Sequence, residues 1–306
     1  PEERNKGDHD DSSREQPQAG HQNRPSCADQ GSHCCHRRSP EDERQDHQQP
    51  SAERSHGVLR TGSFLRSKRV RLIVMIWPWR RKSRRTMARI AIEGAITGST
   101  RRRVLKALKE VQEREFPALL LRIDSPGGTV GDSQEIHAAL LRLRKKGCHV
   151  VASFGNISAS GGVYVGVAAD RIVSNPGTIT GSIGVILRGN NLSKLLDRVG
   201  VKFETVKSGA FKDILSPDRA LGSEERELLQ ALIDSSYEQF VAAVAEGRKL
   251  DPSCVREFAD GRVFSGAQAK DLGLVDELGD EECARVLAAQ LADLDEERCR
   301  VVTLGK

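Results

Sequence analysis

The sequence predicts an α/β protein built on a parallel sheet, and three observations support this. Between residues 88 and 153, apolar stretches of strand length alternate with amphipathic stretches of helix length. Each connection between successive strands is long enough to hold a helix, as parallel pairing requires. Glycine-rich turns at 124–128 and 155–162 follow two of the strands, and ligands of such sheets gather at these strand ends.

Strands and helices are expected to alternate in this region. The first strand alternates apolar and polar residues and ends at Gly94, and Ser99 is placed to cap the helix that follows. The predicted elements are a strand at 88–93, a helix at 99–113, a buried strand at 118–123, a helix ending near 146 and a strand at 148–153. Such a series folds with right-handed crossovers into a parallel sheet.

Beyond residue 170 the pattern is less regular. A short surface helix is expected over 191–198, followed by a strand that begins at Lys202. A longer helix is predicted from about Ser223 to Glu246, and it has a wide apolar stripe. The stripe comprises Leu228, Leu229, Leu232, Ile233, Phe240 and Val244. It would serve either the core of the chain or contacts between copies.

Residues 1–74 predict a disordered tail. They are rich in Gln, His, Arg, Asp and Ser, and they cannot bury enough apolar surface to offset the entropy of ordering. We expect the native chain to start at Met75, a basic leader to occupy 75–86 and the folded domain to span 87–306. The leader would suit peripheral contact with an anionic membrane, although a solvated leader is the simpler interpretation.

Composition limits the classes of function. The net charge of +5 comes from a local basic patch, which argues against nucleic-acid binding. The apolar run at 70–79 is too short to span a bilayer and lacks the flanks of a signal peptide, so a cytoplasmic or membrane-peripheral location is expected. The seven cysteines show no paired spacing, which favours a reducing compartment. Cys34-Cys35-His36 has no second ligand pair, so no metal or other cofactor is predicted.

Ser160 is the first candidate for catalysis. Small residues and two adjacent glycines surround it, and an apolar helical pattern follows. At the mouth of a helix, backbone N–H groups point outward and can stabilise an anion. A serine there either caps the helix or acts as a nucleophile, and this stretch by itself leaves both roles open.

The turn Asp124-Ser-Pro-Gly-Gly128 also has two interpretations. It could simply reverse the chain, because proline fixes φ and glycine accepts a positive φ. Alternatively, Gly127 and Gly128 let a substrate oxyanion approach their N–H groups closely. Neither phosphate-binding glycine pattern is present here. The second glycine turn, at Ser160, favours the oxyanion role.

A nucleophilic Ser160 needs a general base, and histidine is a poor candidate. Six of the eight histidines precede residue 57, while His137 falls in a predicted helix and His149 opens a predicted strand. No histidine follows Ser160, which excludes the chain order of α/β-hydrolases. A Ser-Lys pair remains, in which the lysine must be desolvated to hold a neutral amine. Lys212 has the most apolar neighbours, and the residues alone leave Lys207 as the alternative.

Five motifs, in this order, resemble the signal peptide peptidase A family. They are DSPGG from Asp124, ASGGVY from Ala159, TGSIGV from Thr180, KSGAFKD from Lys207 and DGRVFSGAQAKDLGLVD from Asp260. The resemblance covers roughly residues 88–280 and implies a serine endopeptidase of short, single-module form with a Clp-protease/crotonase-like α/β fold. Matching the motifs implies Ser160 as the nucleophile and Lys212 as the general base. It also implies oxyanion donors among the backbone N–H groups of Gly127, Gly128 and Gly161.

The resemblance further implies an assembly and a class of substrate. Short members form homo-oligomeric rings in which the serine and the lysine come from different protomers, and they cleave unstructured, apolar-rich peptides such as signal-peptide remnants. Two alternatives use the same fold. A crotonase-like acyl-CoA enzyme would need acidic residues at its acyl site and has no use for a Ser-Lys dyad, and a non-catalytic ring scaffold would need neither Ser160 nor Lys212.

Overall fold

The computed structural model describes residues 86–305. Its strands form one sheet in the order β6-β5-β3-β2-β1-β8, with β4 beside β3 and β7 beside β4. The strands are β1 (Thr86–Glu93), β2 (Ala118–Ser125), β3 (His149–Ala159), β4 (Arg171–Ser174), β5 (Ile179–Gly181), β6 (Val263–Ser265), β7 (Glu277–Leu278) and β8 (Arg300–Leu304). These strands pair in parallel, except that β5 and β6 are antiparallel. The predicted α/β class with a parallel sheet is confirmed.

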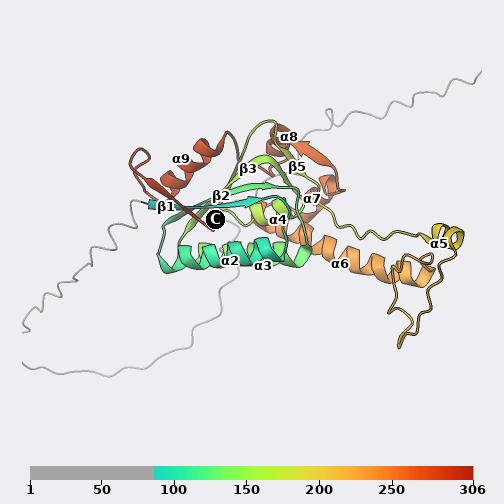
Figure 1. Cartoon of the computed structure of the whole chain (residues 1–306). Coiled ribbons are helices and arrows are strands. Elements are labelled where there is room, and N and C mark those ends of the chain that lie inside the picture. The colour runs from blue at the N-terminus through green and yellow to red at the C-terminus, as the bar shows by residue number, and fades with distance from the viewer. Residues whose placement is uncertain (1–85, 306) are drawn as a thin grey trace, which may run out of the picture. The chain divides into compact units, whose positions relative to one another are not determined.

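Helices cover both faces of the sheet. They are α2 (Gly98–Glu113), α3 (Val130–Lys145), α4 (Gly161–Gly166), α5 (Ser193–Val199), α6 (Ser223–Arg248), α7 (Pro252–Phe258), α8 (Gly266–Asp271) and α9 (Glu281–Leu291). Alternate residues of β1 point to opposite faces: Ile90 packs in the core shared with α2 and α3, whereas Met87 packs with α9. Figure 1 shows α2 and α3 on one side of the strands and α9 on the other.

The third strand is longer than predicted. The sequence suggested a strand that ends at Ser153 and a glycine turn from Gly155, but β3 continues to Ala159. The Asp124 carboxylate accepts hydrogen bonds from the N–H groups of Asn156 and Ile157, which satisfies donors that β2 leaves unpaired at its register shift. The extended end of β3 then pairs with β5. This extension places Ser160 at the carboxyl-terminal end of β3, on the side of the sheet where ligands of such folds bind.

The segment between β5 and α6 differs most from expectation. The predicted surface helix is present as α5, but the strand predicted from Lys202 is wrong: residues 201–207 have no regular structure and are exposed. Among residues 86–305, no strand pairs with this stretch. Figure 1 shows α5 and the loop that follows it near the N-terminal end of α6, away from the strands.

Helix α6 confirms the long predicted helix and divides its apolar stripe. Phe240 and Val244, near its C-terminal end, are buried in the core, whereas Leu228 and Leu232 are exposed. The core of the chain therefore accounts for only part of the stripe.

Several predictions concern residues that the structure does not describe. The disordered tail at 1–74, the start at Met75 and nearly all of the basic leader at 75–86 lie outside residues 86–305. Within the described part of the chain, no helix is both long and apolar enough to cross a membrane. The same residues contain no group of three His, Cys, Asp or Glu side chains that could hold a metal ion.

Candidate active site

Ser160 occupies a strained turn between β3 and α4. Its backbone has φ +52° and ψ −117°, a region that residues with a side chain rarely adopt, and its N–H donates to the Gly181 carbonyl over 2.9 Å. The serine stands at the N-cap position of α4, but its hydroxyl makes no capping hydrogen bond. A serine on a sharp strand-to-helix turn is the arrangement that exposes a nucleophile. The geometry therefore favours the nucleophile over the cap.

The Gly127–Gly128 turn packs directly against Ser160 and Gly161. A Cβ on Gly161 would lie 3.2 Å from the Gly128 nitrogen, and a Cβ on Gly128 would fall 1.9 Å from the Ile96 carbonyl oxygen. Gly128 therefore excludes any side chain, whereas a Cβ on Gly161 would also lie 2.6 Å from Ser133 Oγ and would fit only if its neighbours moved. The Gly127 N–H donates to Ser125 Oγ over 3.1 Å. In contrast, the N–H groups of Gly128 and Gly161 have no acceptor among the described residues.

A small cavity of about 30 Å³ opens beside Ser160. Its wall is mostly apolar and comes from α3, α4, α6 and the loop after β5, and beyond Ser160 it contains three residues with hydroxyl groups. The lining residues beyond Ser160 and its glycine neighbours are Val130, Ser133, Tyr164, Gly184, Val185, Ser236 and Phe240. Tyr164, Gly184 and Val185 belong to the ASGGVY and TGSIGV motifs, and Phe240 belongs to the apolar stripe of α6. Val130, Ser133 and Ser236 carry no signal in the sequence. The cavity suits a small apolar side chain next to the serine.

The two described histidines have structural surroundings. His137 packs edge-on against Tyr164 with ring centroids 5.0 Å apart, and burial lowers its pKa. His149 begins β3, and at about 3.3 Å per residue it lies on the order of 30 Å along the strand from Ser160. This agrees with the expected core and surface roles.

The structure separates the two candidate lysines clearly. Lys207 Nζ donates to the Ala210 carbonyl over 2.9 Å and forms an ion pair of 2.6 Å with Asp213. Lys212 is exposed, and its amine makes no hydrogen bond or ion pair with any described residue. A general base needs a free amine, so the geometry favours Lys212 over Lys207. The desolvation expected for this lysine is absent in the single chain.

Ser160 and Lys212 are not brought together within one chain. Ser236 and Phe240, toward the C-terminal part of α6, line the cavity of Ser160. Asp213, the neighbour of Lys212, is instead tied through Arg219 to Glu225 in the first turn of the same helix. Glu225 and Ser236 are eleven residues apart, which corresponds to about 16 Å at about 1.5 Å per residue. The lysine's turn therefore lies at the N-terminus of α6, whereas the serine's cavity lies against the middle of the helix and the turn that follows it.

Comparison with known proteins assigns the class. The fold resembles the solved structure of a mutant of the "1510-N membrane-bound stomatin-specific protease", with a TM-score of 0.50 and 14% identity over 72% of this chain and 98% of that one. Together with the sheet topology, this likeness confirms the Clp-protease/crotonase-like α/β fold. The family match and the named relatives show a serine-type peptidase. The chain belongs to peptidase family S49, whose profile matches residues 142–295.

Two relatives support the same assignment. The chain is 60% identical over 230 residues to "Putative protease slr0021" of Synechocystis sp., an alignment that covers 75% of this chain and 83% of the relative. It is 42% identical over 181 residues to "Putative signal peptide peptidase SppA" of Enterococcus faecium, covering 59% of this chain and 53% of that protein. The resemblance to the signal peptide peptidase A family is thus confirmed. Membership of a peptidase family also favours peptide-bond hydrolysis over acyl-CoA chemistry and over a non-catalytic scaffold.

Proposed function

We propose that this chain is a serine endopeptidase in which Ser160 is the nucleophile and Lys212 of a neighbouring copy is the general base. The observation that carries the proposal is the strained β3–α4 turn, which holds Ser160 beside two backbone N–H groups that lack acceptors among the described residues. Strain of this kind persists where the surrounding structure holds it, and it is concentrated at functional sites.

The reaction follows from these groups. The neutral amine of Lys212 accepts the Ser160 hydroxyl proton while Oγ bonds to the carbonyl carbon of the substrate and the π electron pair moves to oxygen. Collapse of this tetrahedral oxyanion breaks the C–N bond, and the Lys212 ammonium gives its proton to the departing amine. Water, deprotonated by the same amine, then attacks the acyl-enzyme, and its proton returns to Ser160 Oγ as the acid leaves.

The oxyanion is stabilised by backbone donors at the glycine turns. Gly128 and Gly161 are the better pair among the three glycines that the sequence suggested, because neither N–H group is donated to another described residue. The Gly127 N–H is already donated to Ser125 Oγ. Gly127 contributes instead by having no side chain, because a Cβ there would clash with Ser160 and Gly161.

A second copy of this chain would complete the site. The lysine-bearing segment from β5 to the first half of α6 exposes many large apolar side chains, more than a solvated loop needs. They include Ile186, Leu187, Leu195, Val199, Phe203, Val206, Phe211, Leu228 and Leu232. Packing these side chains on a neighbouring copy would bury Lys212 and supply the desolvation that a neutral amine requires. Repetition of one such head-to-tail contact closes a homo-oligomeric ring.

The substrates are unstructured, apolar-rich peptides, of which signal-peptide remnants are one source. The small apolar cavity beside Ser160 supports a preference for a small apolar side chain before the cleaved bond. The name of the Enterococcus faecium relative points to the same class. We expect an extended peptide because a cavity of about 30 Å³ has room for one small side chain and not for a folded segment.

Mixing inactive variants tests both the dyad and its origin. Ser160→Ala and Lys212→Ala should each abolish cleavage of an apolar fluorogenic peptide while the oligomer, measured by sedimentation, stays intact. Mixing the two proteins under conditions of subunit exchange should restore a fraction of the activity, because some sites then pair an intact serine with an intact lysine. Lys207→Ala tests the alternative base: it removes one of the two cations that bind Asp213, so it should lower the cleavage rate without abolishing it.

Two results would contradict the proposal. Near wild-type cleavage by either single variant would remove that residue from the dyad. An active monomer in ultracentrifugation would show that the site is complete within one chain.

A further inference from the structure

The turn that carries Lys212 is closed by side chains on both sides of it. Lys207 Nζ reaches across the turn to the Ala210 carbonyl and to Asp213 Oδ1, over 2.9 and 2.6 Å. Residues 207 to 213 therefore form a loop whose two ends are joined by an ion pair, and Lys212 lies inside the closed segment.

Arg219 fixes the same turn to helix α6. Its Nη2 donates to Asp213 Oδ1 over 2.9 Å and to the Asp213 carbonyl oxygen over 3.2 Å. Both Nη1 and Nη2 also donate to the Glu225 carboxylate, with 2.8 Å from Nη1 to Oε2. Glu225 Oε2 in turn accepts the Gly222 N–H over 2.9 Å and so closes the N-terminus of α6. A single guanidinium thus links the residue after Lys212 to the first turn of the helix.

Asp213 would be a natural partner for Lys212 if it were not already occupied. Its side chain is only 17% exposed, so its carboxylate needs partners, and hydrogen bonds from Arg219 and Lys207 hold its pKa well below the usual range. Lys212 is its neighbour in sequence, yet the Lys212 amine makes no ion pair with the described residues. The Asp213 carboxylate thus binds Lys207 and Arg219 and not the adjacent Lys212.

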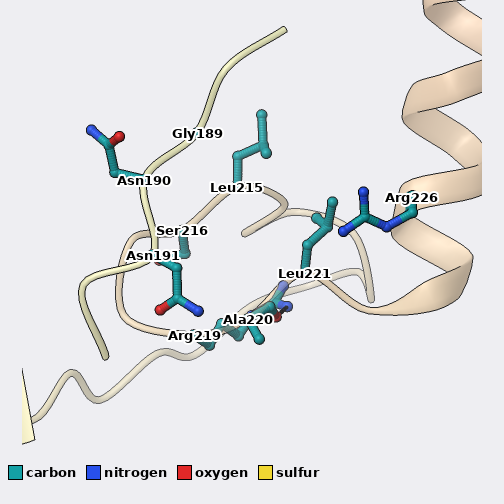
Figure 2. Close-up of a pocket in the computed structure, with 9 residues that line it drawn as sticks. All are labelled: Gly189, Asn190, Asn191, Leu215, Ser216, Arg219, Ala220, Leu221 and Arg226. Carbon is teal, nitrogen blue, oxygen red and sulfur yellow. Dashed lines mark hydrogen bonds between the residues drawn. The ribbon is translucent and has the colours of Figure 1, made fainter. Parts of the chain in front are cut away.

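A cavity of about 230 Å³ adjoins the network and offers a second arginine for comparison. Figure 2 shows Arg226 extending from α6 toward Leu221, while Arg219 lies beside Ala220 on the connecting segment. Arg226 lines the same cavity but makes no hydrogen bond or ion pair with Asp213.

We propose that Arg219 is a positioning residue for Lys212: it anchors the peptide after the lysine to α6 and occupies the carboxylate that would otherwise bind the lysine's ammonium. This inference rests on the proposed function, in which Lys212 is the general base. Loss of Arg219 would free part of the Asp213 carboxylate for the adjacent lysine. A carboxylate beside Lys212 would favour the ammonium form of its side chain, so less of the neutral amine would be present at a given pH.

The test compares three arginine variants of the full chain by steady-state cleavage between pH 6 and pH 10. Arg219→Gln should lower kcat by up to about 10²-fold, the loss typical of a misplaced catalytic group, with little change in KM. The acid limb of its profile of kcat/KM should move to higher pH. Arg219→Lys keeps the cation without the two-pronged geometry, so it should restore the limb in part. Arg226→Gln should match the wild type.

A double variant separates the charge effect from a general loss of structure. In Arg219→Gln/Asp213→Asn no carboxylate remains to pair with Lys212, so the acid limb should return toward the wild-type position. Sedimentation and the thermal midpoint are measured for every variant.

Several outcomes would overturn the inference. An unshifted acid limb in Arg219→Gln would overturn the inference, because a purely structural arginine would leave the pH profile unchanged. This holds if activity is normal and also if activity falls only in proportion to lost assembly. An acid limb that stays displaced in the double variant would overturn it as well. The parallel Lys212→Ala protein keeps the two proposals apart: activity in it overturns the dyad and this inference together, whereas an inactive Lys212→Ala with a normal Arg219→Gln profile overturns this inference alone.

Discussion

Gly127 lies so close to Ser160 that a Cβ on the glycine would come within 2.8 Å of the serine Cβ and 2.7 Å of the Gly161 nitrogen. Its φ of +103° is also one that only glycine adopts without strain. Two loops that are far apart in the sequence therefore touch at backbone distance. The DSPGG turn forms one wall of the nucleophile's turn, and its shape determines where the neighbouring N–H groups point.

Gly127→Ala should therefore reduce activity without unfolding the chain. The added methyl group must displace either the turn or the Gly161 N–H, and loss of one oxyanion donor costs about 10²–10³ in rate. We expect a fall of this size in kcat/KM, measured with a fluorogenic peptide, and a far-ultraviolet circular dichroism spectrum like that of the wild type. A kcat/KM close to that of the wild type would mean that the turn yields without disturbing the site.

Gly131→Ala is the matched control for that experiment. Gly131 lies in the first turn of α3, and a Cβ there would meet no heavy atom within 4 Å. Activity should be unchanged, and alanine should stabilise the helix by about 0.5–1 kcal/mol relative to glycine.

A buried ion pair ties the end of α6 to the sheet. Arg248 and Asp276 are 2.8 Å apart with side chains 3% and 6% exposed, and Asp276 also accepts the Ile172 N–H at the start of β4. Removing Arg248 would leave the buried Asp276 carboxylate with the weaker ion pair to the exposed Arg171, 3.7 Å away. Arg248→Ala should therefore lower the free energy of unfolding by about 3 kcal/mol, the lower end of the loss usual for a broken buried pair. Urea denaturation at a fixed protein concentration measures this difference.

An exposed ion pair between α6 and α7 provides the comparison. Arg256 and Glu238 form an ion pair of 2.6 Å at the surface, and Arg256→Ala should change the free energy of unfolding by at most about 1 kcal/mol. Equal losses in the two variants would refute the assignment of α6's anchor to Arg248.

The stability of the chain should depend on pH through His137. Burial, the largest cause, and the nearby Arg144 lower the pKa of this histidine, while Glu246 acts in the opposite direction. A histidine whose pKa is lower in the folded state binds its proton preferentially in the unfolded chain. Its contribution is therefore complete above about pH 6.5 and is lost as the pH falls below that value.

The measurement is the urea midpoint between pH 5 and pH 8. His137→Phe preserves an aromatic ring against Tyr164 and should show a smaller decline toward pH 5 than the wild type. His149→Gln, at an exposed position, should decline as the wild type does. Parallel curves for wild type and His137→Phe would exclude His137 as the source.

The central sheet was predictable because its signals are local. The apolar run of β2 predicts a buried strand. The spacing of α2 and α3 predicts helices that connect neighbouring parallel strands. The extension of β3 to Ala159 was not predictable, because it depends on the Asp124 carboxylate, thirty-two residues away from Asn156 in sequence, satisfying two N–H groups. A glycine-rich stretch in isolation looks like a turn.

The candidate site was predictable only in its motifs. The glycine turns and Ser160 stand in short strings whose composition signals close backbone approach. Ser133 and Ser236, which line the cavity from two helices, have no such signal because their place in the wall depends on how the helices pack. The strand expected at Lys202 is absent for a related reason, since no strand in the described part of the chain lies beside these apolar residues. The choice between Lys207 and Lys212 needed the ion pair with Asp213, which no pattern reveals.

Helix α6 carries a wall of the serine's cavity along its middle and the lysine's turn at its N-terminus. If the Lys212 of each chain serves the Ser160 of a neighbouring chain, the number of working sites equals the number of junctions between chains and not the number of chains. An open arc of n chains has n − 1 junctions, and only closure adds the last one. Dilution would then switch the peptidase off without any inhibitor, and newly made, unassembled chains would be harmless to the proteins around them.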